Sequence, residues 1–157
     1  MLHNKKKIIG LLAGLSIIAV GCGVNGESGS KVLEEGKVYD GKNATHEIIE
    51  VESGSNWTVK SDKKDDSNYS VVTVDDTGEE IAGYHVINIK AEEVNGDIES
   101  SFAKREGRDF IIVSDEGSVY FRSVAEENKS EIEEALENTD NPDQHVKDIS
   151  NYIFNES

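Results

Sequence analysis

The stretch YSVVTVDDTGEEIAGYHVINIK, residues 69–90, decides how this chain folds. Tyr69 to Val74 is rich in β-branched residues, Asp75 to Gly78 has the composition of a turn, and Ile81 to Lys90 is the longest run that favours a strand. Side chains alternate between the two faces of a strand, so one face of the last run carries Ile81, Gly83, His85, Ile87 and Ile89. This face is the better candidate for the core, which predicts His85 at or near the interior.

Further runs of Val, Ile, Tyr, Thr and Phe lie on both sides of this stretch. They are predicted as short strands over 48–51, 57–60, 98–103, 110–113 and 119–121. The breaks between the runs contain Gly, Asn or Asp, as in Asn95-Gly96. Because a parallel crossover needs a dozen or more residues, links this short predict an antiparallel meander.

The last part of the chain favours helices. Residues 130–133 have the form of a capping box, and Pro142 suits the first turn of a second helix with the apolar stripe Val146, Ile149 and Ile153. The expected fold is therefore α+β, an antiparallel β-meander of about seven short strands with one or two C-terminal helices. This element order resembles that of pleckstrin-homology-like domains in architecture alone, and a small sandwich or a helix-backed open sheet fits the pattern as well.

The N-terminus has the pattern of a secretory signal. Lys5, Lys6 and Lys7 precede an uncharged, mostly aliphatic run over 8–20, and Gly21 stands directly before Cys22, the single cysteine. Over residues 1–22, and only there, the chain resembles a bacterial lipoprotein. The resemblance implies that the Cys22 thiol gains a diacylglycerol with palmitate-type acyl chains, and that the chain is cut just before this residue.

Two alternatives to lipidation remain open. The run could be a retained membrane helix, but its 13 residues fall short of the roughly 20 needed to span a bilayer. An ordinary signal peptidase could also cut the chain and leave Cys22 unmodified. The predicted organisation is a signal peptide over 1–21, lipidated Cys22 with a flexible tether over 22–45, and a single α+β domain over 46–157.

The charge of the chain restricts its partners. Loss of the three signal lysines leaves 13 of the 16 basic residues against all 32 acidic ones, a formal charge of −19. Proteins bind nucleic acid by neutralising phosphates with Lys and Arg, so such a surface excludes nucleic acid as a partner. A cationic peptide or surface protein would be attracted, while the membrane would be contacted through the lipid anchor.

Few residues suggest site chemistry. The histidines 46, 85 and 145 are widely separated and lack the spacing of a zinc site, and no cofactor is expected. An acidic group around Gly78 is a weak candidate for a calcium site, because its spacing does not match a calcium-binding loop: Asp75, Asp76, Glu79 and Glu80. The aromatic residues Trp57, Tyr84 and Tyr120 are the candidate partner surface.

These observations predict a lipid-anchored lipoprotein on the extracytoplasmic face of a bacterial cell membrane. It is expected to be a non-catalytic binding or accessory protein. One alternative is an immunity or exclusion lipoprotein that captures a cationic, bacteriocin-like peptide or a phage component. Another alternative is a metal-dependent or hydrolytic enzyme.

Overall fold

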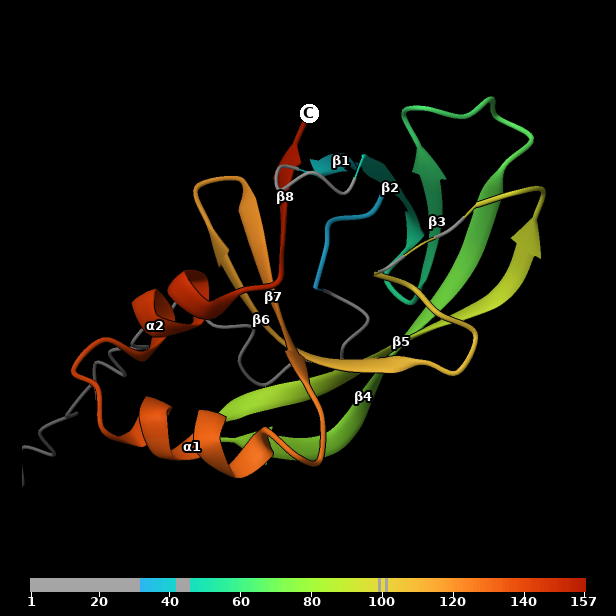
Figure 1. The fold of residues 1–157 in the computed structure, drawn as a ribbon. Helices are drawn as coiled ribbons and strands as arrows, with labels where there is room; N and C mark the ends of the chain where they lie inside the picture. Colours follow the sequence, from blue (N-terminus) through green and yellow to red (C-terminus); the bar gives the residue numbers. More distant parts are fainter. Residues whose placement is uncertain (1–31, 42–45, 99, 101) are drawn as a thin grey trace, which may run out of the picture.

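Eight antiparallel strands form a closed barrel in the computed structural model, which describes residues 32–41, 46–98, 100 and 102–157 (Figure 1). Each strand pairs with its neighbours in the sequence, and β1 pairs with β8 to close the sheet. The strands are β1 (Val38–Gly41), β2 (Glu47–Ser53), β3 (Asn56–Ser61), β4 (Tyr69–Ile81), β5 (Tyr84–Asn95), β6 (Arg108–Asp115), β7 (Ser118–Val124) and β8 (Tyr152–Glu156). Two helices, α1 (Lys129–Glu137) and α2 (Pro142–Ile149), lie between β7 and β8 in the sequence.

The predicted α+β fold class is wrong, because the sheet is a closed barrel and not a meander beside C-terminal helices. The closure is made by two strands that the sequence analysis did not predict. Tyr39 of β1 lies opposite Glu156 of β8, and Gly41 lies opposite Phe154. The first of these strands falls in the predicted tether, and the second falls in the predicted second helix.

The second helix is shorter than predicted because two periodicities overlap at the C-terminus. α2 ends at Ile149, and Ser150 already has extended backbone angles (φ −61°, ψ 142°). Tyr152 and Phe154 then alternate with less buried neighbours, which is the period of a strand. Ile153 fits the helical stripe and the strand equally well, so its position does not distinguish between them.

The run Ile81 to Lys90 is not one strand. Ile81 ends β4 and lies opposite Tyr84 of β5, so the chain reverses at Ala82-Gly83. Both turn residues have positive φ (48° and 86°), as in the two-residue hairpins that match the twist of a sheet. The turn predicted over 75–78 instead lies inside β4, where the register with β5 shifts between Asp76 and Glu80 as a bulge.

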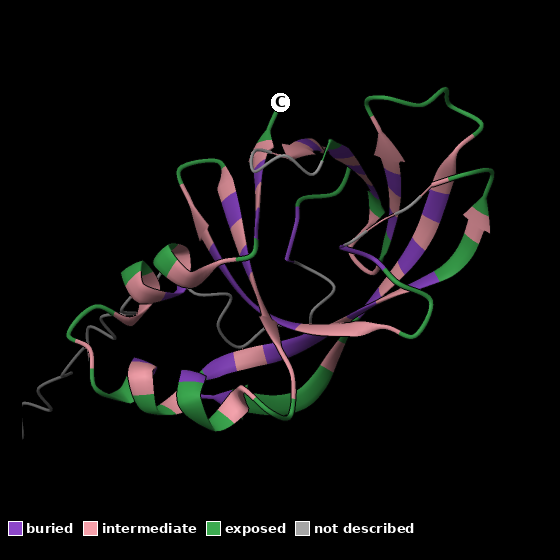
Figure 2. Ribbon diagram, in the orientation of Figure 1, coloured by how far each residue is buried: buried purple, intermediate pink, exposed green. Residues whose placement is uncertain are grey.

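Side chains from all eight strands fill the barrel interior. Figure 2 shows buried residues alternating with less buried ones along these strands, while the turns are exposed. Ile87 and Ile89 belong to this core as predicted, whereas His85 is half-buried beside the bulge. An eight-stranded barrel has an interior just wide enough for side chains to fill, and this one is packed in that way.

The predicted strand over 98–103 is wrong, because the described residues there form no strand. Instead, Phe102 inserts into the barrel and is 0% exposed. Its ring centroid lies 4.9–5.4 Å from those of four aromatic side chains: Phe110, Phe121, Tyr152 and Phe154. The segment around Phe102 therefore contributes to the core without forming a strand of the barrel.

The two helices cover the outside of the barrel and create a second core. It comprises Ile81, Tyr84, Val86, Ile111, Val113, Ile132, Leu136 and Val146. β5 and β6 are consequently buried on both faces over part of their length. This explains the uninterrupted apolar run 110–113, since a strand covered on both sides needs no polar face.

Different segments close the two ends of the barrel. At the 62–68 end, β2 begins and β3 ends, and the Asp97 backbone N–H donates to Asn68 Oδ1 at 2.7 Å. At the 32–37 end, β2 ends, and the Gly36 N–H donates to the Val51 carbonyl at 2.9 Å. Because a strand rises about 3.3 Å per residue, the seven residues of β2 separate the two ends by about 20 Å.

The folded domain begins earlier than predicted. Val32 and Leu33 are 6% and 2% exposed and belong to the barrel core, and β1 follows directly after them. The expected domain boundary at residue 46 is therefore wrong, because the predicted tether contains both a core segment and a strand of the barrel.

Candidate functional site

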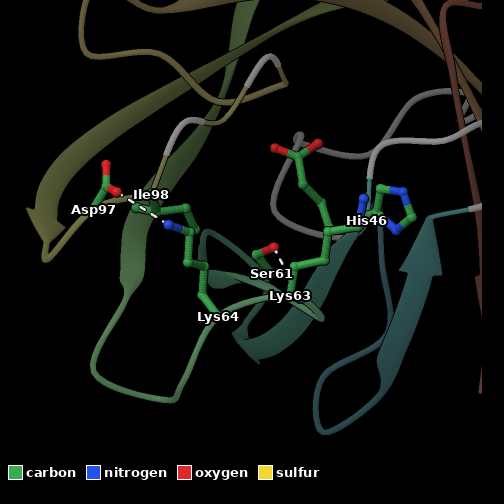
Figure 3. A pocket seen from close by; sticks show the side chains of 7 residues that line it. His46, Ser61, Lys63, Lys64, Asp97 and Ile98 are labelled. Carbon is green, nitrogen blue, oxygen red and sulfur yellow. Dashed lines mark hydrogen bonds and ion pairs between the residues drawn. The ribbon is translucent and has the colours of Figure 1, made fainter.

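A pocket of about 360 Å³ opens at the 62–68 end of the barrel (Figure 3). Its lining comes from the start of β2, the end of β3 with the loop after it, and the segment after β5: His46, Glu47, Ser61, Lys63, Lys64, Asp97 and Ile98. In Figure 3, Lys64 and Asp97 lie on one side of the pocket and His46 on the other.

Most charges of this pocket are paired across its rim. Lys64 Nζ lies 3.1 Å from Asp97 Oδ2, and His46 Nδ1 lies 3.3 Å from Asp62 Oδ2. Among the described residues, the Lys63 ammonium forms no hydrogen bond or ion pair, while its backbone N–H donates to the Ser61 hydroxyl at 3.3 Å. These groups are exposed, so each pair contributes at most about 1 kcal/mol to stability.

Glu47 is the buried carboxyl of this end of the barrel. It is 3% exposed, and its Oε1 accepts a hydrogen bond from the Ser100 hydroxyl. Burial raises the pKa of Glu47 above its ordinary value, while hydrogen bonds from Ser100 and the Phe102 backbone and the positive charge of Arg108 act in the opposite direction. Its Oε2 has no hydrogen-bond partner within the described residues, which adds to the cost of ionising the group.

Arg108 lies beside this carboxyl and packs on aromatic rings. Its guanidinium carbon is 5.4 Å from the ring centroids of both Phe110 and Tyr152, and Nη1 donates to the Tyr152 hydroxyl at 2.7 Å. A guanidinium over an aromatic face is stabilised by the ring quadrupole. Arg108 therefore joins the buried carboxyl to the aromatic core.

Replacing Glu47 with glutamine is expected to change how stability depends on pH. The raised pKa means that the folded state binds the Glu47 proton more tightly than the unfolded state does. This contribution is fully present below the ordinary pKa of a glutamate and is lost as the pH rises through the folded-state value. E47Q should therefore gain stability relative to the native chain as the pH rises above about 4, the ordinary pKa of a glutamate.

Denaturant unfolding of both proteins at several pH values measures this difference. Glu50→Gln is the matched control, since Glu50 lies on the same strand and forms an ion pair with Lys60 at 2.9 Å. A stability difference between E47Q and the native chain that stays constant over this pH range would show that the carboxyl titrates alike in both states.

The structure does not gather Trp57, Tyr84 and Tyr120 into one exposed surface. Trp57 is 0% exposed inside the barrel, with its ring centroid 6.5 Å from that of Phe121. The prediction that Trp57 anchors an interface is wrong, because a partner cannot reach a side chain inside the barrel. Trp57 stands two residues before the inward-facing Val59. Because side chains alternate along a strand, this spacing indicates that Trp57 points inward too.

The two tyrosines instead attach α2 to the outside of the barrel. Tyr84 is 7% exposed, and its hydroxyl donates to the Asp143 carboxylate. Burial raises the pKa of Tyr84, and this hydrogen bond raises it further. The half-exposed Tyr120 has the Lys147 ammonium 5.9 Å from its ring centroid. Both residues therefore contact a helix of the same chain.

The acidic group around Gly78 belongs to the bulge in β4. His85 Nδ1 lies 2.8 Å from Asp76 Oδ2, and its Nε2 lies 3.5 Å from Glu80 Oε1. Glu79 pairs with Lys129 of α1, which draws it towards the helix. In the part of the chain that the structure describes, no group of three or more His, Cys, Asp or Glu residues is placed to hold a metal ion.

The surface formed by α1 and the end of β4 is strongly acidic, and these elements lie side by side (Figure 1). Nine exposed carboxylates define this acidic face: Asp75, Glu79, Glu80, Glu126, Glu127, Glu131, Glu134, Glu137 and Asp140. Within 75–81 and 126–140 the single basic residue is Lys129, and its ammonium is paired with Glu79. Such a concentration of one charge produces a negative potential that attracts cations.

Cys22 and the signal pattern lie outside the described residues. Within the described part of the chain, no helix combines the length and the apolar character needed to cross a bilayer. Comparison with family models, with curated proteins and with solved structures finds no match for this chain.

Proposed function

We propose that this chain is a lipid-anchored binding protein on the extracytoplasmic face of a bacterial membrane, with a cationic peptide or the basic surface of another protein as its partner. The signal pattern that ends at Cys22 supports the anchor. The observation that carries the binding function is the acidic face, which has nine exposed carboxylates and a single lysine that is itself paired with Glu79. In this proposal the protein catalyses no reaction.

Packing supports a binding surface on the outside of the barrel. Aromatic and aliphatic side chains from all eight strands fill the interior, and Phe102 and Leu33 add to this core from the two ends. A partner therefore meets the outer surface, where the chain has a large excess of negative charge. Complementary charge raises the rate of encounter and the local concentration of a basic partner.

Binding of a fluorescent oligolysine of about ten residues tests this proposal. The triple variant E134Q/E137Q/D140N removes three charges from the acidic face, all away from the first turn of α1. We expect its dissociation constant for the peptide to rise roughly fivefold at low salt. Binding by the native chain should weaken strongly at about 0.5 M salt, because the screening length then falls below the spacing of surface charges.

The matched control removes the same number of exposed charges elsewhere, in the triple variant E35Q/D66N/E116Q. Its affinity for the peptide should change less than about twofold if the acidic face is the site. Equal losses in both variants would show that only the net charge matters. Peptide binding by the native chain that is insensitive to salt would contradict an electrostatic site altogether.

A further inference from the structure

Resting on the proposed lipid anchor, we propose that the barrel is held within about 35 Å of the bilayer, with its 32–37 end towards the membrane and its 62–68 end away from it. Two features limit the position of the barrel: the length of chain between the anchor and the first core residue, and the place where that residue enters the barrel.

The link between the lipid and the barrel is short. Val32 and Leu33 are buried in the core, so only residues 23–31 separate the barrel from Cys22. Ten Cα-to-Cα steps join Cys22 to Val32, and a fully extended chain spans at most about 3.3–3.6 Å per step, or about 35 Å in all. If the link behaves as a random coil, its root-mean-square span is roughly 17 Å.

The link joins the barrel at one end. Val32, Glu34 and Glu156 line a common pocket of about 350 Å³ with the turn between β6 and β7. The Lys37 ammonium also lies 2.5 Å from a carboxylate oxygen of Glu156, beside the last strand. The attachment point therefore belongs to the 32–37 end, while Asp66 lies in the loop at the opposite end.

The short link restricts the orientation of the barrel relative to the bilayer. The two ends are separated by about 20 Å along β2. To bring the 62–68 end to the bilayer, the link would have to run along the side of the barrel, which leaves about 15 Å of fully extended chain to reach the lipid. Exclusion of the barrel from the bilayer therefore favours the orientation in which the attachment end faces the membrane.

Charge prevents the attachment end from adsorbing to an anionic membrane. Its exposed residues include Glu34, Glu35, Glu116 and Glu156, and anionic lipids repel them. The link, and not surface attraction, thus sets the distance. The pocket lined by Lys63 and Lys64 opens away from the membrane, and a partner of the barrel has to approach to within a few tens of ångströms of the bilayer.

Energy transfer to the lipid headgroups measures this orientation. Since Cys22 is the single cysteine and carries the lipid, Glu35→Cys and Asp66→Cys each provide one free thiol for a donor dye. The lipid-modified full chains are placed in vesicles of phosphatidylethanolamine and phosphatidylglycerol that contain a headgroup-labelled acceptor lipid. We expect at least about 1.5-fold more transfer from E35C than from D66C, because the ends differ by about 20 Å.

A lengthened link provides the control. Inserting about 20 Gly and Ser residues after Ser28 should lower transfer from E35C and reduce the difference between the two sites, since the span grows with the square root of length. Equal transfer from both sites in lipid-modified protein, or stronger transfer from D66C, would overturn the orientation and leave the anchor intact. Intact mass showing no lipid would overturn both the anchor and this inference.

Discussion

Replacing Phe102 with alanine is expected to lower the free energy of unfolding by about 3–5 kcal/mol. Phe102 is 0% exposed, and its ring contacts the rings of Phe110, Phe121, Tyr152 and Phe154 at the centre of the barrel. Removing it exposes four aromatic faces to a cavity that rigid strands cannot close. A typical domain is stable by about 5–15 kcal/mol, so this single change takes a large share of the total.

Urea unfolding followed by the fluorescence of Trp57, which is buried in the same core, measures the change. Phe102→Leu is the matched variant: it keeps most of the apolar volume, so its loss should be less than half that of the alanine variant. Tyr69→Ala, at a residue that is not buried, should cost much less than either. A loss below about 1 kcal/mol for F102A would place the side chain outside the core.

The position of Phe102 in the core could not be predicted from the sequence. Residues 98–103 have strand composition, but the register of β5 against β6 is set between Ile87 and Phe110, which leaves this segment outside the ladder. A buried aromatic residue in a connection has the same local pattern as one in a strand. Only the pairing of distant strands distinguishes the two cases.

Strands with strong local patterns were predictable. The runs 48–51, 57–60, 110–113 and 119–121 lie within β2, β3, β6 and β7, and both predicted helices exist as α1 and α2. Closure of the barrel was not predictable in the same way. It depends on contacts between Tyr39 and Glu156, residues that are far apart in the sequence, and β1 has only four residues.

The hairpin between β4 and β5 was misplaced because its turn residues are unusual. Asp75-Asp76-Thr77-Gly78 has a stronger turn composition than Ala82-Gly83, and alanine rarely adopts the positive φ that this hairpin requires. A polar side chain of the first segment instead forms a hydrogen bond with the backbone of the bulge, where the Gly78 N–H donates to Asp76 Oδ1 at 2.8 Å. Local composition identifies a backbone irregularity there, but not its kind.

The candidate site was predicted less well than the strands. Trp57 proved to be a core residue, which its alternation with Val59 along β3 already indicates. Tyr84 and Tyr120 proved to contact α2, which the strand pattern alone does not indicate. The same alternation applied to β2 places Glu47 on the inward face with Ile49 and Val51, a signal that the sequence analysis did not use. The pocket at the 62–68 end needed the structure, because its residues come from three separate segments.

Replacing Cys22 with serine is expected to abolish lipidation completely. In the proposed anchor, the thioether to diacylglycerol forms at the sulfur of this residue, and the sequence has no other cysteine that could substitute. Two acyl chains bind a bilayer durably, at about 0.8 kcal/mol per buried methylene, whereas the acidic domain by itself is repelled by anionic lipids. Labelled palmitate should therefore enter the native chain and not C22S, and intact mass should show a native product that begins at a modified residue 22.

The double variant C22S/S28C tests whether lipidation requires a cysteine at position 22 or only a cysteine somewhere near the N-terminus. It restores one cysteine but places it after Glu27, outside the apolar run and small residues of the signal, so it should remain unlabelled. A native chain without lipid would remove the anchor from the proposed function. In that case the acidic face would still be tested by oligolysine binding, because the charges around α1 depend on the fold of the barrel and not on the attachment of the chain to a membrane.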